Sequence, residues 1–356
     1  MQRSLFLLLL MGQCSFFMCH LYEYHFISES KTWEEARDYC RETHTDLATV
    51  YDMTNVKSLR LIFPRRRQEG AWIGLRSDPE KENRKWHWSL PGVEFSSTEN
   101  DWHDNQPNNQ NDAQNCMQII NHKWKNVNCA QKAKFVCCNG SHFRVVDDSM
   151  TWPEAQSYCR DQLTDPVSGL TQLKKDERLL IGLFRDTWRW SDNSSSSFRN
   201  WDPNCFDDDK QQKCAVSNGS GKWSSDDCRK KKPFFCYNDK IVLIKESKTW
   251  EEALKHCKRY QYDLVSITNP DQQRLVQVRA EKAETDYVWM GLRYTCVLDL
   301  WFWDSDNLVC YENWASGGKS DRCDESGAMD KKGPHEWFGR SKDEELNFIC
   351  ALRKSG

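Results

Sequence analysis

The sequence predicts an α+β protein of three tandem domains, each with two helices near its start, short antiparallel strands, a long loop region and disulfide bridges. The first observation is internal repetition, because one helix-start motif occurs three times: SKTWEEARDYC (30–40), SMTWPEAQSYC (149–159) and SKTWEEALKHC (247–257). The second is that each copy ends in a short apolar strand closing on cysteine: FVC (135–137), FFC (234–236) and FIC (348–350). Short strands with only two early helices favour an α+β domain over a parallel-sheet enzyme.

The first twenty residues have the layout of a secretory signal peptide. Arg3 precedes an apolar run from Leu5 to Met18, so we expect residues 1–20 to be removed and the mature protein to be secreted. No later segment approaches the length of a membrane span. In an oxidising compartment the 17 cysteines are expected in disulfides rather than as metal thiolates, and no CxxC pair is present. The net charge of −3 points to neither nucleic acid nor a membrane surface as a partner. Three glycosylation sequons fit an exported surface, with acceptors Asn139, Asn193 and Asn218.

A capping box is predicted at the start of the first helix in every copy, where two side chains satisfy free backbone amides. The pairs are Thr32 with Glu35, Thr151 with Glu154, and Thr249 with Glu252. In the first copy Trp33, Ala36 and Cys40 then fall at i, i+3 and i+7. One helix face therefore carries a large ring, a small residue and a thiol, as expected of a buried face.

A β-prone run follows each first helix, then a second helical pattern and a strand: WIGL (72–75), IGL (181–183) and WMGL (289–292). The second copy is shorter here. Cys159 to Ile181 is 22 residues, while Cys40 to Trp72 and Cys257 to Trp289 are 32 each. A second helix of normal length does not fit into the shorter interval. This is consistent with a structural role for that copy.

The ordered combination of these motifs resembles the C-type lectin-like domain. It comprises the TWEEAxxYC helix, the WIGL strand, a Pro-Asn loop within WHDNQPNNQNDAQNC (102–116), a Trp-led segment ending in cysteine, and the terminal strand. Nearly the whole mature chain is covered, as in the tandem ectodomains of mannose-receptor-like proteins. The resemblance implies a first domain over 21–138, a shortened second domain over 139–237 and a third over 238–356.

The resemblance also implies one long-range and one short bridge in each complete copy. The expected bridges are Cys40–Cys137, Cys116–Cys129, Cys159–Cys236, Cys214–Cys228 and Cys257–Cys350. In the third copy Lys342 stands where a short-bridge cysteine belongs, so Cys296 and Cys310 are expected to pair in the long loop. Cys138, Cys205 and Cys323 are left over. If Cys14 and Cys19 leave with the signal, 17 − 2 = 15 cysteines remain, an odd number. A Cys138–Cys205 bridge and a disulfide-linked dimer both stay open.

In sugar-binding members of the family five side chains hold a calcium ion beside a cis proline. The matching positions in the first copy are Gln106, Asn108, Gln114, Lys125 and Asn126, with Pro107 as the proline. This set offers four amides, one ammonium and no carboxylate, whereas calcium affinity depends largely on the number of carboxylates. We therefore expect no metal and no other cofactor. The second copy (Asp202-Pro203-Asn204) and the third (Glu312-Asn313-Trp314) do not retain the set either.

The expected function is recognition of a glycan or an extracellular protein without calcium, through Gln106, Asn108, Gln114 and Asn126. One alternative is a structural or matrix protein, in which these amides satisfy backbone groups and the recurring tryptophans pack the cores. Another is a calcium-dependent lectin acting through the first domain. An enzyme is not expected, because HExxH and GxSxG are absent and neither His103 nor His122 has a sequence partner that would make it a base. We interpret Arg65-Arg66-Arg67 as a solvated loop in preference to a glycosaminoglycan contact.

Overall fold

The computed structural model describes the chain from residue 21 to residue 352 with internal gaps. The described ranges are 21–65, 69–78, 80, 84–90, 95, 102–108, 113–139, 142–162, 164–168, 178–194, 196–203, 213–305, 309, 311–320 and 322–352. The expected signal peptide therefore lies outside the described residues, as do Cys205 and Cys310. The described residues form two compact units, one of residues 24–238 and the other of residues 239–352 with residues 21–23.

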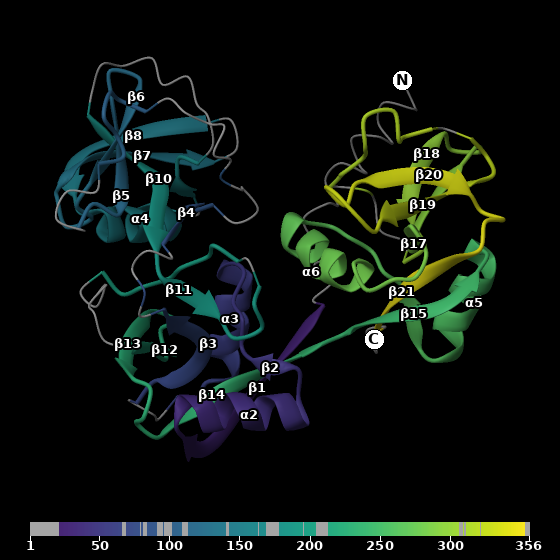
Figure 1. Ribbon diagram of the computed structural model, residues 1–356, viewed down its shortest axis with the longest axis horizontal. Coiled ribbons are helices and arrows are strands. Elements are labelled where there is room, and N and C mark those ends of the chain that lie inside the picture. Colours follow the sequence, from purple (N-terminus) through teal and green to yellow (C-terminus); the bar gives the residue numbers. More distant parts are fainter. Residues whose placement is uncertain are drawn as a thin grey trace. The chain divides into compact units, whose positions relative to one another are not determined.

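The second of these units contains the third repeat, which closes on itself. Its elements are β15 (Ile241–Lys248), α5 (Trp250–Arg259), β16 (Tyr262–Leu264), α6 (Pro270–Ala280), β17 (Tyr287–Thr295), β18 (Leu300–Trp303), β19 (Glu325–Asp330), β20 (Trp337–Ser341) and β21 (Leu346–Leu352). The main sheet runs β15-β21-β17-β19-β20, with β16 paired to β21 and β18 paired to β17. Figure 1 shows this sheet in green to yellow, with α5 and α6 beside it.

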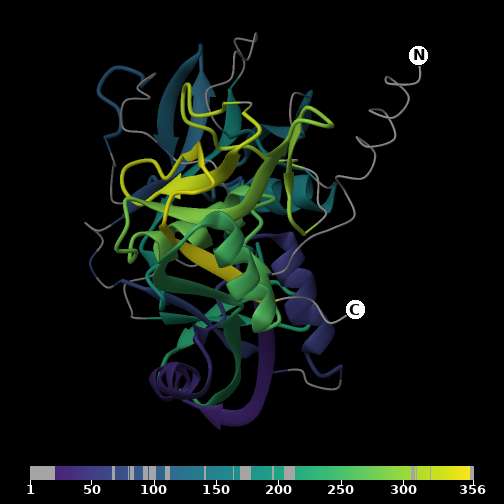
Figure 2. The same cartoon turned by 90° about the vertical axis from the view of Figure 1, so that its right-hand side faces the viewer.

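The unit of residues 24–238 contains two sheets with the same topology, but each combines half of the first repeat with half of the second. We call the first lobe A. It takes β1 (Tyr22–Lys31), α2 (Trp33–Thr43), β2 (Asp46–Leu47), α3 (Met53–Ile62) and β3 (Ala71–Ser77) from the first repeat, and β11 (Trp188–Trp190), β12 (Lys213–Ser217), β13 (Trp223–Asp227) and β14 (Lys232–Asp239) from the second. Its sheet runs β1-β14-β3-β12-β13, matching the third repeat strand for strand. Figures 1 and 2 both show purple β1 beside green β14.

Lobe B contains the complementary halves. They are β4 (Lys85–Trp88), β5 (Cys116–Ile120), β6 (Lys123–Val127) and β7 (Ala133–Asn139) from the first repeat, and β8 (His142–Met150), α4 (Trp152–Asp161), β9 (Asp165–Pro166) and β10 (Leu179–Asp186) from the second. The sheet order β8-β7-β10-β5-β6 again repeats that of the third unit. The first two repeats have therefore exchanged their C-terminal halves within one chain.

Two short connections account for the exchange. Only Thr187 separates β10 from β11, whereas the shortest common hairpin loop has two residues, so β10 cannot turn back and continues into lobe A. In the third repeat the matching connection spans the four residues from Cys296 to Asp299, and β18 pairs back onto β17. At the junction of the repeats, two residues separate β7 from β8, and the strands pair antiparallel from Asn139 opposite His142. The single-residue connection leads the second repeat from lobe B into lobe A, and the two-residue connection pairs the last strand of the first repeat with the first strand of the second.

The exchange corrects two of the expected disulfides. Cys40 is bridged to Cys236 and Cys137 to Cys159, instead of Cys40 to Cys137 and Cys159 to Cys236. The physical reason is that the strand carrying Cys236 lies in lobe A beside α2, while the strand carrying Cys137 lies in lobe B beside α4. The predictions of Cys116–Cys129, Cys214–Cys228 and Cys257–Cys350 are confirmed.

The third repeat holds one more correction. Cys296 is bridged to Cys323, so the expected Cys296–Cys310 bridge is wrong. Ser326, and not Cys323, occupies the strand position of Cys116, since Ser326 pairs with Arg340 as Cys116 pairs with Val127. Cys323 therefore lies outside the strand and reaches the end of β17.

The helix starts agree with the sequence in every repeat. Thr32, Thr151 and Thr249 each accept from the backbone of the glutamate three residues later, and each glutamate accepts from the threonine backbone. The tryptophan that follows is buried, and its indole N–H donates to a strand carbonyl at 2.7–2.9 Å in all three copies. The expected second helix is present as α3 and α6, while residues 169–177 of the second repeat lie outside the described ranges.

Tryptophans pack the cores beneath the loops. Edge-to-face pairs recur at centroid distances of 5.4–5.8 Å, and they are Trp88–Trp124, Trp190–Trp223 and Trp303–Trp337. The predicted packing role of these rings is confirmed, because all six are almost fully buried. Among the helices that the structure describes, none combines the length and the apolar character needed to cross a membrane.

Candidate functional site

The candidate site is the loop between β4 and β5 in lobe B, described over residues 102–108 and 113–115. Trp102 forms a backbone bridge with Trp124, and the His103 amide donates to the Trp124 carbonyl at 2.8 Å. The Gln106–Pro107 peptide bond is cis, as the resemblance implied. The loop therefore keeps the backbone arrangement that presents the residues on both sides of the proline.

Three of the four predicted amide residues meet around Asn126. This side chain is fully buried; its Oδ1 accepts from the Asn108 amide at 3.3 Å, and its Nδ2 donates to the Gln114 carbonyl at 3.5 Å. Both ends of the Asn126 amide are thus engaged in holding two arms of the loop together. A buried amide with both ends bonded stabilises the arrangement of the loop.

Gln106 differs from the other three amides. Its Oε1 is buried and has no hydrogen-bond partner among the described residues, while the residue as a whole is half-buried. Pro107 and Asn108, which follow it, are exposed. A buried oxygen is not accessible to a ligand in this arrangement of the loop, so the accessible amide at this place is that of exposed Asn108.

The chemistry of the donor set does not fit calcium. The five matched positions carry no negative charge, and Lys125 adds a positive one, so an ion would meet neutral oxygens and repulsion. In the part of the chain that the structure describes, no group of three histidine, cysteine or acidic side chains could hold a metal. Asp104 is exposed, and Asp112 lies outside the described residues.

The side chains at the matching positions of the other two copies have different surroundings. In lobe A, Asp202 is half-buried, while Asn204 and Gln212 lie outside the described residues. In the third repeat Glu312 forms an ion pair with Lys319 at 2.9 Å, and Asn313 donates to the His335 carbonyl at 3.0 Å. Those two side chains are engaged within the protein.

Arg185 is a residue of the site that sequence reasoning missed. It belongs to β10 of the second repeat, and its Nε donates to Oδ1 of Asn115, next to Gln114, at 3.0 Å. Its guanidinium lies 5.1 Å from the ring centroid of Trp86, which in turn lies 5.7 Å from Trp102. The exchange brings this cation to the loop of the first repeat, and the shortened interval before Trp190 was the sequence signal for it.

The predicted glycosylation acceptors are placed unevenly. Asn193 is exposed, with a positive φ of 61°. Asn218 is half-buried, and its Oδ1 accepts from the Ser220 hydroxyl at 2.6 Å and from two backbone amides. The sequon of Asn139 includes residues 140 and 141, which are outside the described ranges. Use of the three acceptors stays a prediction.

The protein contains three sheets of one topology, and each has one helix that starts with a capping box and one long loop above a disulfide. This arrangement defines a tandem array of lectin-type folds. The family model described as the lectin C-type domain matches residues 29–139, 148–238 and 246–352. The chain belongs to the C-type lectin domain family.

Similar proteins contain several such domains. C-type mannose receptor 2 of Homo sapiens is 22% identical over 369 residues, which cover 82% of this chain and 24% of the receptor. Lymphocyte antigen 75 of Homo sapiens is 25% identical over 253 residues, covering 57% of this chain and 14% of that protein. The chain thus spans a quarter or less of these relatives. Among solved structures, human lithostathine is 21% identical with a TM-score of 0.30, covering 32% of this chain and 83% of its own.

Proposed function

We propose that this is an exported recognition protein that binds a carbohydrate or an extracellular protein through the lobe B loop, without calcium and without catalysis. The observation that carries the proposal is the buried Asn126 amide, which ties the two arms of the loop together where the family uses a metal. Membership of the lectin family supports binding as the activity. The loop also offers the exposed side chain of Asn108 to a ligand.

Aromatic and cationic groups at the loop suit a polar ligand. Half-buried Trp102 and the Arg185–Trp86 stack flank the amides, and rings of this kind pack against the apolar faces of sugars or against protein side chains. Loops on a disulfide-bridged scaffold are also where recognition usually resides.

A glycan array probed with the secreted chain, once with calcium and once with chelator, tests the proposal. We expect the same glycans to be bound in both conditions. Gln106→Ala with Asn108→Ala should weaken binding about tenfold, because the accessible Asn108 amide and the side chain that supports it before Pro107 are both removed. Exposed Gln131 of the same lobe provides a matched control, and Gln131→Ala should leave binding unchanged. Binding that disappears with chelator would refute calcium independence, and the absence of glycan binding would shift the ligand to protein.

The donor chemistry can be tested by restoring charge. The variant Gln106→Glu, Gln114→Glu, Lys125→Asn and Asn126→Asp should gain calcium affinity in the range of about 10⁻⁴–10⁻³ M, as in extracellular modules with acidic ligands. Calorimetric titration measures it, with the same variant retaining Lys125 as control. No heat from the full variant would mean that the loop geometry, and not its charge, prevents calcium binding.

The odd cysteine count supports a second, smaller proposal. If the mature chain keeps 15 cysteines, one thiol is available for a bridge between two chains. A fraction of the secreted protein should then migrate as a dimer on a non-reducing gel and as a monomer after reduction. Identical migration under both conditions would exclude the dimer.

A further inference from the structure

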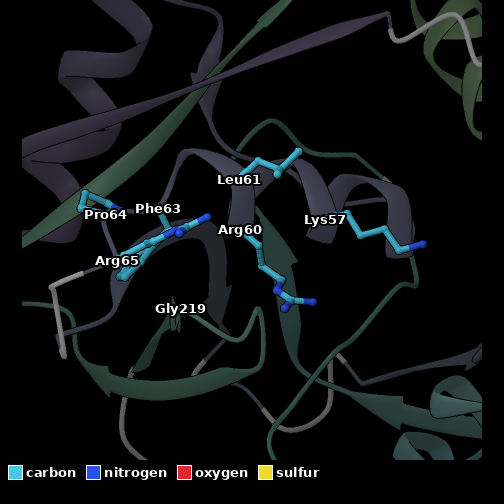
Figure 3. A pocket seen from close by; sticks show the side chains of 7 residues that line it. All are labelled: Lys57, Arg60, Leu61, Phe63, Pro64, Arg65 and Gly219. Carbon is cyan, nitrogen blue, oxygen red and sulfur yellow. The ribbon is translucent and has the colours of Figure 1, made fainter.

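A second candidate site lies in lobe A, away from the loop just described. A pocket of about 660 Å³ is lined by residues from the end of α3, the segment after it, and the turn between β12 and β13: Lys57, Arg60, Leu61, Phe63, Pro64, Arg65 and Gly219. Figure 3 shows the side chains of the helix and the following segment on one side and Gly219 opposite them. The first repeat supplies six of these residues and the second repeat supplies Gly219, so the exchange creates the pocket.

The charge of the pocket is entirely positive. Lys57, Arg60 and Arg65 line it, and among the described lining residues none carries a carboxylate. None of these three cations forms an ion pair with another residue that the structure describes. The sequence continues this pattern, since residues 53–67 contain five lysines and arginines and no aspartate or glutamate. Like charges gathered around one cavity repel each other, and an anion that bridges them removes this repulsion.

Small residues keep the pocket open. A Cβ at Gly219 would lie 3.5 Å from the Phe63 ring, so a longer side chain there would enter the space between them. A Cβ at Gly221 would meet the Arg60 side chain at 3.0 Å, which shows how closely the stem of Arg60 packs over the turn. The guanidinium of Arg60 extends beyond the turn toward the pocket (Figure 3).

The same place in the third unit has a different lining, although two of the three cations have basic counterparts. By position after the bridged cysteine, Lys57 corresponds to Arg274, Arg65 to Lys282 and Arg60 to Gln277. Counting from the bridged cysteines, Pro64 (64 − 40 = 24) corresponds to Glu281 (281 − 257 = 24). Counting back from Trp223 and Trp337, Gly221 corresponds to His335, and Nε2 of His335 lies 3.5 Å from the Glu281 carboxylate. There an acid and a ring replace the proline and the glycine. The third unit thus adds the Glu281 carboxylate at this place, whereas the charged lining in lobe A is purely cationic.

The side chains favour a ligand with several fixed anionic groups over an acidic peptide. Peptides usually anchor an apolar side chain in a pocket, but Phe63 is almost fully buried in the core and Leu61 projects away from Arg60 (Figure 3). Guanidinium groups bind sulfate-like oxygens through paired hydrogen bonds, and lysine adds a point charge. We propose that this pocket binds a sulfated glycosaminoglycan segment, with Lys57, Arg60 and Arg65 contacting its sulfate groups.

Binding of a heparin-derived, fully sulfated octasaccharide to the full secreted chain tests this. N-glycans are removed first, because the Asn218 sequon adjoins the pocket through Gly219. Calorimetry should show binding that chelator does not affect and that weakens about tenfold or more between 0.1 M and 0.5 M NaCl. This result is independent of the lobe B loop, so Gln106→Ala with Asn108→Ala should leave it unchanged.

Two variants locate the binding. Lys57→Gln, Arg60→Gln and Arg65→Gln together should weaken it about tenfold or more, since three exposed ion pairs are lost. A control with the same change in net charge removes three exposed lysines elsewhere, as Lys123→Gln, Lys132→Gln and Lys231→Gln, and should change binding less than about twofold. Gly219→Glu keeps every cation and the sequon but adds a carboxylate at the pocket, and should weaken binding about fivefold or more.

Several outcomes would overturn the proposal. They are equal binding of a desulfated octasaccharide, equal losses in the triple variant and its control, and no binding at all. Tighter binding of a polyglutamate peptide would assign the pocket to an acidic protein segment instead. Capture by vesicles of phosphatidylserine and phosphatidylcholine without binding of the octasaccharide would assign it to a membrane surface.

Discussion

The pair of exchanged lobes and the third unit have the same sheet topology but reach it by different routes. In the third unit one repeat supplies every strand, and in lobes A and B two repeats each supply half. The buried polar groups differ as well. Arg199 pairs with Asp186 at 2.7 Å and Arg160 with Asp165 at 2.8 Å, and all four side chains are at most 7% exposed. The position of Arg160 is held by Lys258 in the third unit and by Arg41 in lobe A, and these two side chains are 43% and 45% exposed. Arg199 has no basic counterpart in the third unit, so its buried pair is the clearer difference.

This difference shows that connection length, and not strand sequence, decides which halves combine. Strands β3, β10 and β17 occupy the same sheet position and are all followed by a strand with the Trp-x-Trp pattern: β4, β11 and β18. A hairpin forms where four residues intervene and fails where one does. The seven residues between β3 and β4 would also permit a hairpin, yet β3 pairs with β11 and β4 with β10, so the single-residue connection of the second repeat decides the pairing in both lobes. Short hinge loops are a recognised cause of domain swapping, and here the swap is closed within one chain.

The largest expected effect comes from separating the repeats. Residues 142–238 produced alone should fail to fold, because Thr187 cannot form the hairpin that a closed domain requires. Residues 239–352 should fold alone and unfold cooperatively. Circular dichroism during thermal unfolding measures both. A cooperative transition in the isolated second repeat would remove the steric reason for the exchange.

Disulfide mapping tests the exchange in the whole chain. Peptides from the native protein should contain Cys40–Cys236 and Cys137–Cys159. Inserting four turn residues after Thr187 and about eight flexible residues after Asn139 should let each repeat close, so that Cys40–Cys137 and Cys159–Cys236 become the main species. The third-repeat bridge Cys257–Cys350 serves as the internal control. Native peptides with Cys40–Cys137 would contradict the exchange directly.

The buried ion pairs should make lobe A more sensitive than the third unit to loss of a cation. Arg199→Met leaves Asp186 buried and uncompensated, which should cost about 3–5 kcal/mol. Lys258→Met also leaves a buried carboxylate, that of Asp304, but the lysine side of this pair is open to water, so the cost should be smaller, about 1 kcal/mol. Denaturant-dependent hydrogen exchange, resolved by peptide, reports the two units separately. Similar losses of stability in both variants would show that burial of the Arg199 pair does not raise the cost of removing its cation.

The exchanged lobes should also be less stable in acid. His87 on β4 packs 5.8 Å from the Phe184 ring of β10, and burial lowers the pKa of His87 from 6.5 to about 4. The unfolded chain therefore takes up this proton at higher pH than the folded chain, and stability falls as the pH drops from 6.5 to 4. The loss should reach about 3 kcal/mol.

A natural control exists for this histidine, because the third unit has Phe302 at the matching position. His87→Phe should flatten the stability of lobe B between pH 6.5 and 4, measured by denaturant unfolding at several pH values. An unchanged pH dependence in that variant would assign the acid sensitivity to other groups.

Local features of the fold could be read from the sequence because they depend on a few neighbouring residues. The three capping boxes, the buried Trp33 and the short Cys116–Cys129 bridge need only residues within one helix or hairpin. The pairing of the halves could not be read from the motifs, since lobes A and B offer equivalent partners for each strand. The signal lay in the spacing. From Gly182 to Trp190 is 8 residues, against 14 from Gly74 to Trp88 and 12 from Gly291 to Trp303.

The candidate site likewise has one feature that the sequence predicts and others that it does not. The cis bond before Pro107 follows from the family motif. The roles of Asn126 and Gln106 do not, because whether an amide bonds to backbone or faces a ligand depends on the placement of the opposite arm. The role of Arg185 and the pocket of Lys57–Arg65 could not be predicted from the sequence, because each is formed by residues of two different repeats. The motifs place a domain boundary between these repeats, whereas each lobe of the fold combines them.

The smallest expected effect is the loss of a helix cap, and its cost should be equal in lobe A and in the third unit. Thr32→Ala in lobe A and Thr249→Ala in the third unit each remove a helix cap and should cost about 1 kcal/mol, with less than about 0.5 kcal/mol between them. Hydrogen bonds from the capping threonines lower the pKa of Glu35 and Glu252. The stability that these hydrogen bonds contribute is therefore lost as the pH falls through the folded-state pKa of each carboxyl. Hydrogen exchange of the α2 and α5 peptides measures both costs. A much larger loss at Thr32 would mean that the exchange couples the start of α2 to the rest of lobe A, because in a closed unit the cap affects its own helix alone.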